Sequence, residues 1–232
     1  MMLAASDVSV RLRKWNSPDD RWHWALQNIN LQFHEGDRVG VVGRNGSGKS
    51  TLCRVLAGIL SPTQGTVGRE GKVIPLLGFG AALQPELSGY QNARLLARLL
   101  GASSKDVPRI LEEVERKTEL EDWLKEPVIH YSTGMRARLA FVVATSIAAD
   151  VLLVDEALGA GDLAFRTQAM KRLTFFMQEA KVLVMVSHQL HEIRKQCNRV
   201  IWLENGMIRQ DGGTEHVLDQ YQEHMNQKRI NQ

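Results

Sequence analysis

Apolar and polar residues alternate in the first part of the chain. The segments 7–13 (DVSVRLR) and 26–33 (LQNINLQF) predict strands with one covered face. Continuous apolar runs follow at 38–42 (RVGVV), 151–155 (VLLVD) and 182–187 (VLVMVS), and such runs are typical of buried strands in a parallel sheet. Helical patterns separate these runs. The sequence therefore predicts an α/β fold with a mainly parallel sheet and an antiparallel N-terminal part.

Helical spacing replaces the strand signals between about residues 82 and 147. The segments PELSGYQNARLLARLLG, VPRILEEVERKTEL and GMRARLAFVVATSIAA each predict a helix. We interpret this region as a helical subdomain inserted into a single domain of residues 1–232. The sheet core of that domain would span about 1–81 and 148–232.

Three further elements complete the predicted fold. LCRVLAGIL at 52–60 has helical spacing, and Asn205-Gly206 joins two short strands as a hairpin turn. A polar helix begins at about residue 214. Its apolar stripe consists of Leu218, Tyr221 and Met225, for which packing is the expected role.

Composition excludes several classes of protein. A chain of 232 residues with 44% hydrophobic content can bury one core, and a net charge of +3 is far below that of a dedicated nucleic-acid binder. No apolar run is long enough for a signal sequence or a membrane span. Cys53 and Cys197 lack metal-ligand spacing, which favours free buried thiols in a reducing compartment.

The stretch GRNGSGKST at 43–51 matches the pattern of a phosphate-binding loop and lies between a predicted buried strand and a helix. The alternative is a chance glycine-rich turn, but this placement favours the phosphate site. Backbone N–H groups, the helix start and Lys49 would hold the phosphates, and Ser50 would bind Mg²⁺. The expected ATP-binding residues are Gly43, Asn45, Gly46, Ser47, Gly48, Lys49, Ser50 and Thr51.

Two other predicted strand ends carry polar residues toward the same sheet edge. VLLVDE delivers Asp155, expected to hold Mg²⁺ through the second shell, and Glu156, expected to orient and deprotonate the attacking water. His188 follows the strand VLVMVS, where its imidazole would reach the γ-phosphate. The alternatives are a merely solvated acidic pair and a structural histidine. We therefore expect Lys49, Glu156 and His188 to be catalytic.

A second predicted anion site lies at YSTGMRARLA, residues 131–140, where Ser132, Thr133 and Gly134 begin a helix. It lies on the other side of the helical segment from Lys49, so we do not expect both sites to close on one phosphate within a molecule. Two chains packed head to tail would join Ser132 of one to the phosphate held by Lys49 of the other. The sequence therefore predicts a homodimer with ATP at its interface.

The ordered set of motifs resembles the ABC ATPases, a P-loop NTPase family, over nearly the whole chain. GRNGSGKST resembles their Walker A loop, VLLVDE the Walker B strand, ALGAGD at 157–162 the D-loop and SHQ at 187–189 the switch histidine. YSTGM stands where the family commonly has LSGGQ, keeping Ser132 and Gly134. The resemblance implies an ATPase whose nucleotide contacts include Ser132, Gly134 and Asp162.

YSTGMRARLAF and LLGFGAALQPELSGYQNARLLARLLG resemble ATPase subunits of bacterial polysaccharide exporters. The resemblance implies export of capsule, O-antigen or teichoic acid through a polytopic membrane permease, with the chain at the cytoplasmic face of the inner membrane. The glycan would be contacted only indirectly, because the carbohydrate-binding domain of some members is not expected here.

The same resemblance implies two further nucleotide contacts. Gln84 is the nearest candidate for the Q-loop glutamine, which contacts nucleotide and Mg²⁺, although the common position falls on Phe79. Trp24 fits the aromatic residue that stacks on adenine, and Trp22 and Trp15 are close enough in sequence to compete.

Two other classes of function remain open at this point. A soluble ABC ATPase acting on DNA or ribosomes would show long coiled coils or two cassettes per chain, and neither pattern occurs. A P-loop kinase would have no use for YSTGM. No nucleic-acid partner is expected.

Overall fold

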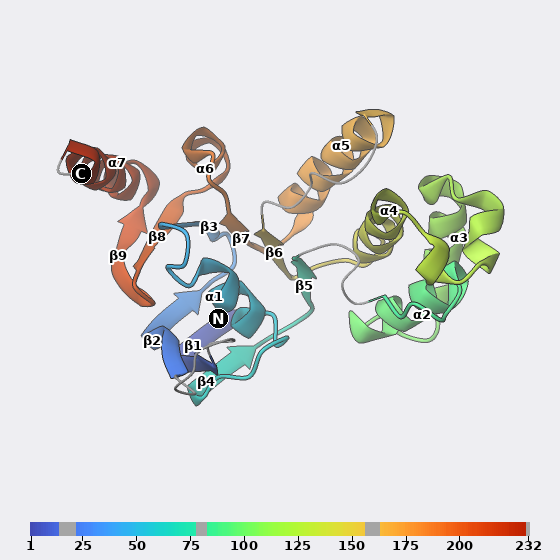
Figure 1. The fold of residues 1–232 in the computed structure, drawn as a ribbon, viewed down its shortest axis with the longest axis horizontal. Coiled ribbons are helices and arrows are strands. Elements are labelled where there is room, and N and C mark those ends of the chain that lie inside the picture. The colour runs from blue at the N-terminus through green and yellow to red at the C-terminus, as the bar shows by residue number, and fades with distance from the viewer. Residues whose placement is uncertain (14–21, 78–82, 156–162, 231–232) are drawn as a thin grey trace. The chain divides into compact units, whose positions relative to one another are not determined.

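The structure, a computed structural model, describes residues 1–13, 22–77, 83–155 and 163–230. The ranges 14–21, 78–82, 156–162 and 231–232 lie outside the description. The chain forms two compact units (Figure 1). Unit 1 comprises Met1–Gly71, Leu153–Glu156 and Lys181–Gln232, and unit 2 comprises Lys72–Leu152 and Ala157–Ala180.

An antiparallel sheet of order β2-β1-β4 begins unit 1. Its strands are β1 (Leu3–Arg13), β2 (Trp22–Phe33) and β4 (Gln64–Arg69). Both strands predicted for this part are present, but each begins four residues earlier than predicted. The alternation is interrupted in β1 because register shifts occur around Val8, and Asp7 has a φ of 51°.

A second sheet has the order β5-β6-β7-β3-β8-β9. Its strands are β3 (Arg38–Val42), β5 (Val73–Leu76), β6 (Val151–Asp155), β7 (Val182–Val186), β8 (Arg199–Glu204) and β9 (Met207–Gly213). β3 lies between β7 and β8 and is parallel to both, and β9 is antiparallel to β8. The predicted α/β class with a mainly parallel sheet is confirmed. The continuous apolar run of β7 arises because this strand is buried along its whole length.

The helices of unit 1 are α1 (Lys49–Leu56), α6 (Leu190–Gln196) and α7 (Thr214–Ile230). The predicted range 52–60 for the first helix was wrong at both ends. The helix already begins at Lys49, and Gly58, which follows its end, has a φ of +77°. The packing role predicted for α7 is confirmed for Leu218 and Tyr221, which contact a buried cluster built on Trp202 of β8.

Unit 2 contains α2 (Gly89–Leu99), α3 (Val107–Thr118), α4 (Thr133–Ala144) and α5 (Leu163–Glu179), with the 3₁₀ turns Glu121–Lys125 and Val128–His130. A helix forms in each of the three segments predicted to be helical between 82 and 147. Ser88 and Gln91 begin α2 as a reciprocal capping box. In the part of the chain that the structure describes, no helix is long and apolar enough to span a membrane.

Candidate functional site

The phosphate-loop sequence forms the connection between β3 and α1, as its pattern predicts. Gly48 has a φ of +105°, and a Cβ at this position would lie 2.6 Å from the carbonyl oxygen of Ala25. A Cβ on Gly43 would lie 2.3 Å from the carbonyl oxygen of Leu203. Both positions therefore require glycine, because backbone from two other strands occupies the space of a side chain.

The ammonium group of Lys49 is folded into this loop. Its Nζ donates hydrogen bonds to the carbonyl oxygens of Gly43 at 2.7 Å and Arg44 at 3.1 Å, and the residue is 7% exposed. These bonds hold a full positive charge beside the N-terminus of α1, where the helix dipole adds partial positive charge. The arrangement favours binding of an anion at the loop.

The hydroxyl of Ser47 tests whether the loop fits a phosphate ligand. Its Oγ is buried and has no hydrogen-bond partner among the described residues. An unpaired buried hydroxyl costs about 1–3 kcal/mol, and an anionic oxygen at the loop would provide an acceptor. The residues present therefore fit a polyphosphate.

Ser50 and Asp155 meet at the carboxyl end of β6. The Oγ of Ser50 donates to Oδ2 of Asp155 at 3.2 Å, which brings together the two predicted Mg²⁺ residues of unit 1. Hydroxyl and carboxylate oxygens are suitable ligands for this cation. Burial, and to a smaller extent the charge of Asp155, raise the pKa of the Cys53 thiol to about 12, so this buried cysteine is neutral.

A backbone contact that the sequence did not indicate fixes the loop. The amide of Gly206, in the β8–β9 turn, donates to the carbonyl oxygen of Ser47 at 3.0 Å. The carbonyl oxygen of Gly206 accepts from the amide of Gln27 in β2 at 2.8 Å. The predicted turn is confirmed, since Asn205 and Gly206 have φ values of 51° and 77°. The turn thus joins β2 to the phosphate loop.

The same strand carries the predicted adenine-stacking residue. Trp24 is 38% exposed and directly precedes Ala25, whose carbonyl lies against Gly48. Trp22 is 50% exposed, and the guanidinium of Arg11 lies over its ring at 4.7 Å. Trp15 lies outside the described residues. Trp24 therefore offers an exposed indole one residue before Ala25, whereas the ring of Trp22 already contacts a cation.

His188 lies at the end of β7, exposed, and lines a cavity of about 220 Å³ in unit 1. Gly43 of the phosphate loop lines the same cavity, and so do Tyr221 and Met225 of α7. The structure therefore brings His188 to the phosphate loop, with the C-terminal helix beside both. Glu156, the predicted base, lies outside the described residues.

The predicted second anion site is a helix N-terminus in unit 2. Ser132 is the N-cap of α4, and its Oγ accepts a hydrogen bond from the amide of Met135 at 3.2 Å. Tyr131, one residue earlier, is buried, and its hydroxyl donates to the carbonyl oxygen of Trp123 at 2.5 Å. Burial is the main reason that the pKa of Tyr131 is raised to about 12. Tyr131 anchors the helix start, whereas Ser132 and Thr133 are exposed.

Gln84 also belongs to unit 2, with an exposed side chain. Its amide donates to Oδ1 of Asn92 at 2.7 Å, and its carbonyl oxygen accepts from Nδ2 of Asn92 at 2.9 Å. Asn92 is 1% exposed and holds this backbone segment on α2, a role that no motif indicated. Phe79 and Asp162 lie outside the described residues.

Comparison with known proteins gives a consistent result. The family model described as "ABC transporter" matches residues 26–159. The O-antigen export system ATP-binding protein RfbB of Klebsiella pneumoniae is 37% identical over 88% of this chain and 83% of its own length. RfbE of Yersinia enterocolitica, with the same description, is 44% identical over 79% of this chain and 77% of its own. The teichoic acids export ATP-binding protein TagH of Listeria innocua is 34% identical, and the match covers 86% of this chain and 59% of TagH.

Solved structures agree with this fold. The dimeric ATP-binding cassette MJ0796 bound to ADP and Pi has a TM-score of 0.70 at 22% identity, over 92% of this chain and 99% of that one. An ATP-binding subunit of an ABC transporter has a TM-score of 0.74 at 21% identity, over 95% and 93%. The fold is that of an ATP-binding cassette.

Proposed function

The chain belongs to the ABC transporter family, and from this premise we propose that it binds and hydrolyses ATP to power export of a cell-surface polysaccharide. The observation that carries the proposal is the close approach of Ser50 to Asp155 beside the glycine-dependent loop that holds Lys49. The O-antigen relatives match most of the chain, which supports polysaccharide as the exported class.

Within one chain, we assign nucleotide binding to the residues around the phosphate loop. Lys49 and the amides of the loop hold the phosphates, and Trp24 stacks on the adenine. Ser50 would hold Mg²⁺ directly and Asp155 through the second shell, and the cation would neutralise phosphate charge. We assign Gln84 to the same cation. The buried hydroxyl of Ser47, which has no hydrogen-bond partner in the described part of the chain, supports this assignment.

For hydrolysis, we assign the proton-accepting role to Glu156 and contact with the γ-phosphate to His188. A carboxylate that orients water and takes its proton contributes roughly 10²- to 10⁴-fold in rate. The position of His188 beside Gly43 supports its role, since both residues line one cavity.

A second copy of the chain completes each site in this proposal. Ser132 and Gly134 at the start of α4, with Asp162, contact the nucleotide held by Lys49 of the other copy. The N-terminus of α4 supports this, because Ser132 and Thr133 are exposed there and the partial positive charge of the helix start is available to an anion from outside the molecule. Such contacts made only in the closed dimer let nucleotide binding drive closure.

The partner that moves the polysaccharide is, in this proposal, a polytopic membrane permease. The chain binds it at the cytoplasmic face of the bacterial inner membrane and contacts the glycan only indirectly. The relatives' descriptions as ATP-binding proteins of export systems support a separate translocating subunit.

The test is purification of the chain from detergent-solubilised membranes, followed by identification of the proteins that accompany it. We expect a polytopic membrane protein and ATPase activity that depends on Mg²⁺. A Lys49→Ala variant should keep the membrane partner and lose the activity. Co-purification of ribosomes or DNA instead of a membrane protein would contradict the export function.

A further inference from the structure

Unit 2 contains a large cavity between α3, the end of α4 and α5. Its volume is about 630 Å³, within the range of about 300–1,000 Å³ that is usual for small-molecule sites. Apolar side chains form much of its wall, among them Phe141, Val142, Phe175 and Phe176. Phe175 is 63% exposed, although it is one of the largest apolar side chains of α5. Exposed apolar surface at a cavity is typical of a binding site.

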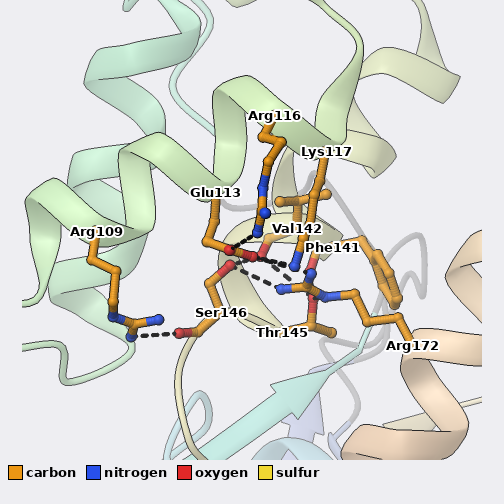
Figure 2. Close-up of polar contacts among 9 residues, drawn as sticks. All are labelled: Arg109, Glu113, Arg116, Lys117, Phe141, Val142, Thr145, Ser146 and Arg172. Carbon is orange, nitrogen blue, oxygen red and sulfur yellow. Dashed lines mark hydrogen bonds and ion pairs between the residues drawn. The ribbon is translucent and has the colours of Figure 1, made fainter.

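Basic side chains line the same cavity. Four positive charges come from Arg109, Lys117, Lys171 and Arg172. Among the described residues that line the cavity, one carboxylate, that of Glu113, opposes them. Figure 2 shows the ion pairs of this carboxylate, which are made by Arg116 and Lys117 from α3 and by Arg172 from α5. The cavity therefore has an excess of positive charge after its internal ion pairs are counted.

The internal ion pairs fix the shape of the cavity wall. Arg172 also donates to Oγ1 of Thr145 at 2.5 Å and to Oγ of Ser146 at 3.0 Å, at the end of α4. Arg109 donates to the carbonyl oxygen of Ser146 at 3.0 Å (Figure 2). Although burial opposes ionisation, hydrogen bonds and charge from Lys117 and Arg116 lower the pKa of Glu113 to about 2. Glu113 is therefore ionised and paired within this wall.

We propose that this cavity binds an anionic amphiphile, a molecule with an alkyl or aromatic body and one anionic head group. The body would lie against Phe141, Phe175 and Phe176, which burial of apolar surface favours. Lys117 and Arg172 are paired with Glu113. The anionic head group would therefore lie at the other two basic residues of the lining, Lys171 and Arg109. A cation of the same shape would be repelled. The same chemistry is available from a membrane lipid or from a free acyl anion.

The direct test is calorimetric titration of the full chain with dodecanoate below its micelle-forming concentration, in the presence of saturating ADP. The probe carries a carboxylate and no phosphate, and ADP occupies the phosphate loop, so that the loop does not contribute to the measured binding of dodecanoate. We expect saturable binding, and at least tenfold weaker binding of both dodecyltrimethylammonium, which reverses the charge, and butanoate, which removes most of the chain. Equal affinity for dodecanoate and dodecyltrimethylammonium would overturn the proposal.

Two substitutions on exposed positions assign binding to this cavity. Lys171→Glu and Phe175→Ser should each weaken dodecanoate binding about tenfold, which corresponds to about 1.4 kcal/mol. Their matched controls in unit 2 are Lys105→Glu and Leu99→Ser, which change exposed residues outside the cavity lining and should have less than a twofold effect. Wild-type affinity in both cavity variants would contradict the site.

A vesicle experiment separates the two sources of the ligand. Co-sedimentation with phosphatidylglycerol vesicles that is lost in Lys171→Glu would support the site and identify a membrane lipid as its source. Dodecanoate binding without such co-sedimentation would support the site and indicate a soluble acyl anion. If an acidic amphipathic peptide bound through Lys171 and Phe175 while dodecanoate did not, the cavity would be a protein-docking groove and the proposal would be wrong.

Discussion

The amide of Gly206 donates a 3.0 Å hydrogen bond to the carbonyl oxygen of Ser47, across a large separation in sequence. Gly206 belongs to the β8–β9 turn, and its carbonyl oxygen is bonded in turn to the amide of Gln27 in β2. The β8–β9 hairpin thus holds the backbone of the phosphate loop at Ser47. In the proposed mechanism the hairpin itself contacts no phosphate. Loop shape should therefore depend on the hairpin turn.

Gly206→Val tests this dependence. Gly206 has a φ of +77°, and a Cβ at this position would lie 2.7 Å from the carbonyl oxygen of Ala25, so the turn must move. Strain of this kind costs about 1–3 kcal/mol. We expect ATP affinity to fall about tenfold, measured by equilibrium titration with a fluorescent ATP analogue.

The matched control for this change is Gly213→Ala. Gly213 lies at the end of the same hairpin, and a Cβ there would meet no atom within 4 Å. This variant should bind ATP as the wild type does. Circular dichroism should show that both variants are folded. Unchanged ATP affinity in a folded Gly206→Val protein would mean that the turn does not shape the loop.

Glu156→Gln tests the assignment of the catalytic base. The amide keeps the size of the side chain but cannot accept a proton, so we expect hydrolysis to fall by roughly 10²- to 10⁴-fold. Nucleotide binding should persist, because Lys49 and the loop amides are unchanged. Initial rates of phosphate release and a binding titration measure the two quantities. Glu35→Gln, an equivalent change at an exposed turn residue, should leave both unaltered.

The strands that could be predicted from the sequence are those whose burial leaves a regular pattern. Arg38–Val42 and Val182–Val186 are buried along nearly their whole length and appear as apolar runs. Gln64–Arg69 could not be recognised because it contains two glycines and is mostly exposed. Val73–Leu76 is four residues long and includes a proline, so no period can be read.

The candidate site likewise has one part that could be predicted from the sequence and one part that could not. The phosphate loop is predictable because its backbone conformation requires glycine at fixed spacing. The support from Gly206 and Ala25 was not predictable, since a glycine in the sequence does not show which distant strand its backbone will contact. Asn92 was also missed, because its bonds to the backbone of Gln84 become visible only when the chain is folded.

Acid titration should report on how α7 is attached to β8. The carboxylate of Glu204 accepts a hydrogen bond from Lys228 at 2.9 Å and pairs with Arg209, and Lys228 is the principal cause that lowers the pKa of Glu204 to about 2. A lowered pKa means that the carboxylate stabilises the fold above its ordinary value of 4.5. This contribution should be lost as pH falls from about 4.5 toward 2.

Comparison with Glu204→Gln isolates that contribution. The difference in unfolding free energy between wild type and variant should be constant above pH 5 and shrink below it, as followed by urea denaturation at several pH values. Glu192→Gln, at a partly exposed position of α6, should show a much smaller pH dependence. A wild-type minus Glu204→Gln difference that does not change between pH 6 and 3 would contradict the role of the ionised carboxylate.

Ser132→Arg tests whether each ATP site is shared between two chains. The large cation at the exposed start of α4 should disable the site that it enters and abolish ATPase activity when both chains carry it, whereas a single chain should still bind ATP through Lys49. The substitution also removes the bond from Met135 to Ser132 Oγ, a loss of about 1 kcal/mol. Ser132→Gly is the control for the added bulk and charge of arginine, because glycine at an N-cap costs only a few tenths of a kcal/mol and adds no bulk.

Mixing two inactive variants gives the decisive measurement. A dimer of one Ser132→Arg chain and one Lys49→Ala chain contains one composite site with both Lys49 and Ser132 intact, and one site with neither. In an isologous dimer the mixture should therefore recover ATPase activity that each variant lacks alone. If both residues acted on nucleotide within the same chain, each chain would keep its own defect and mixing would restore nothing. Absence of recovery, with heterodimer formation shown by differently tagged chains, would place the two halves of the site in one molecule.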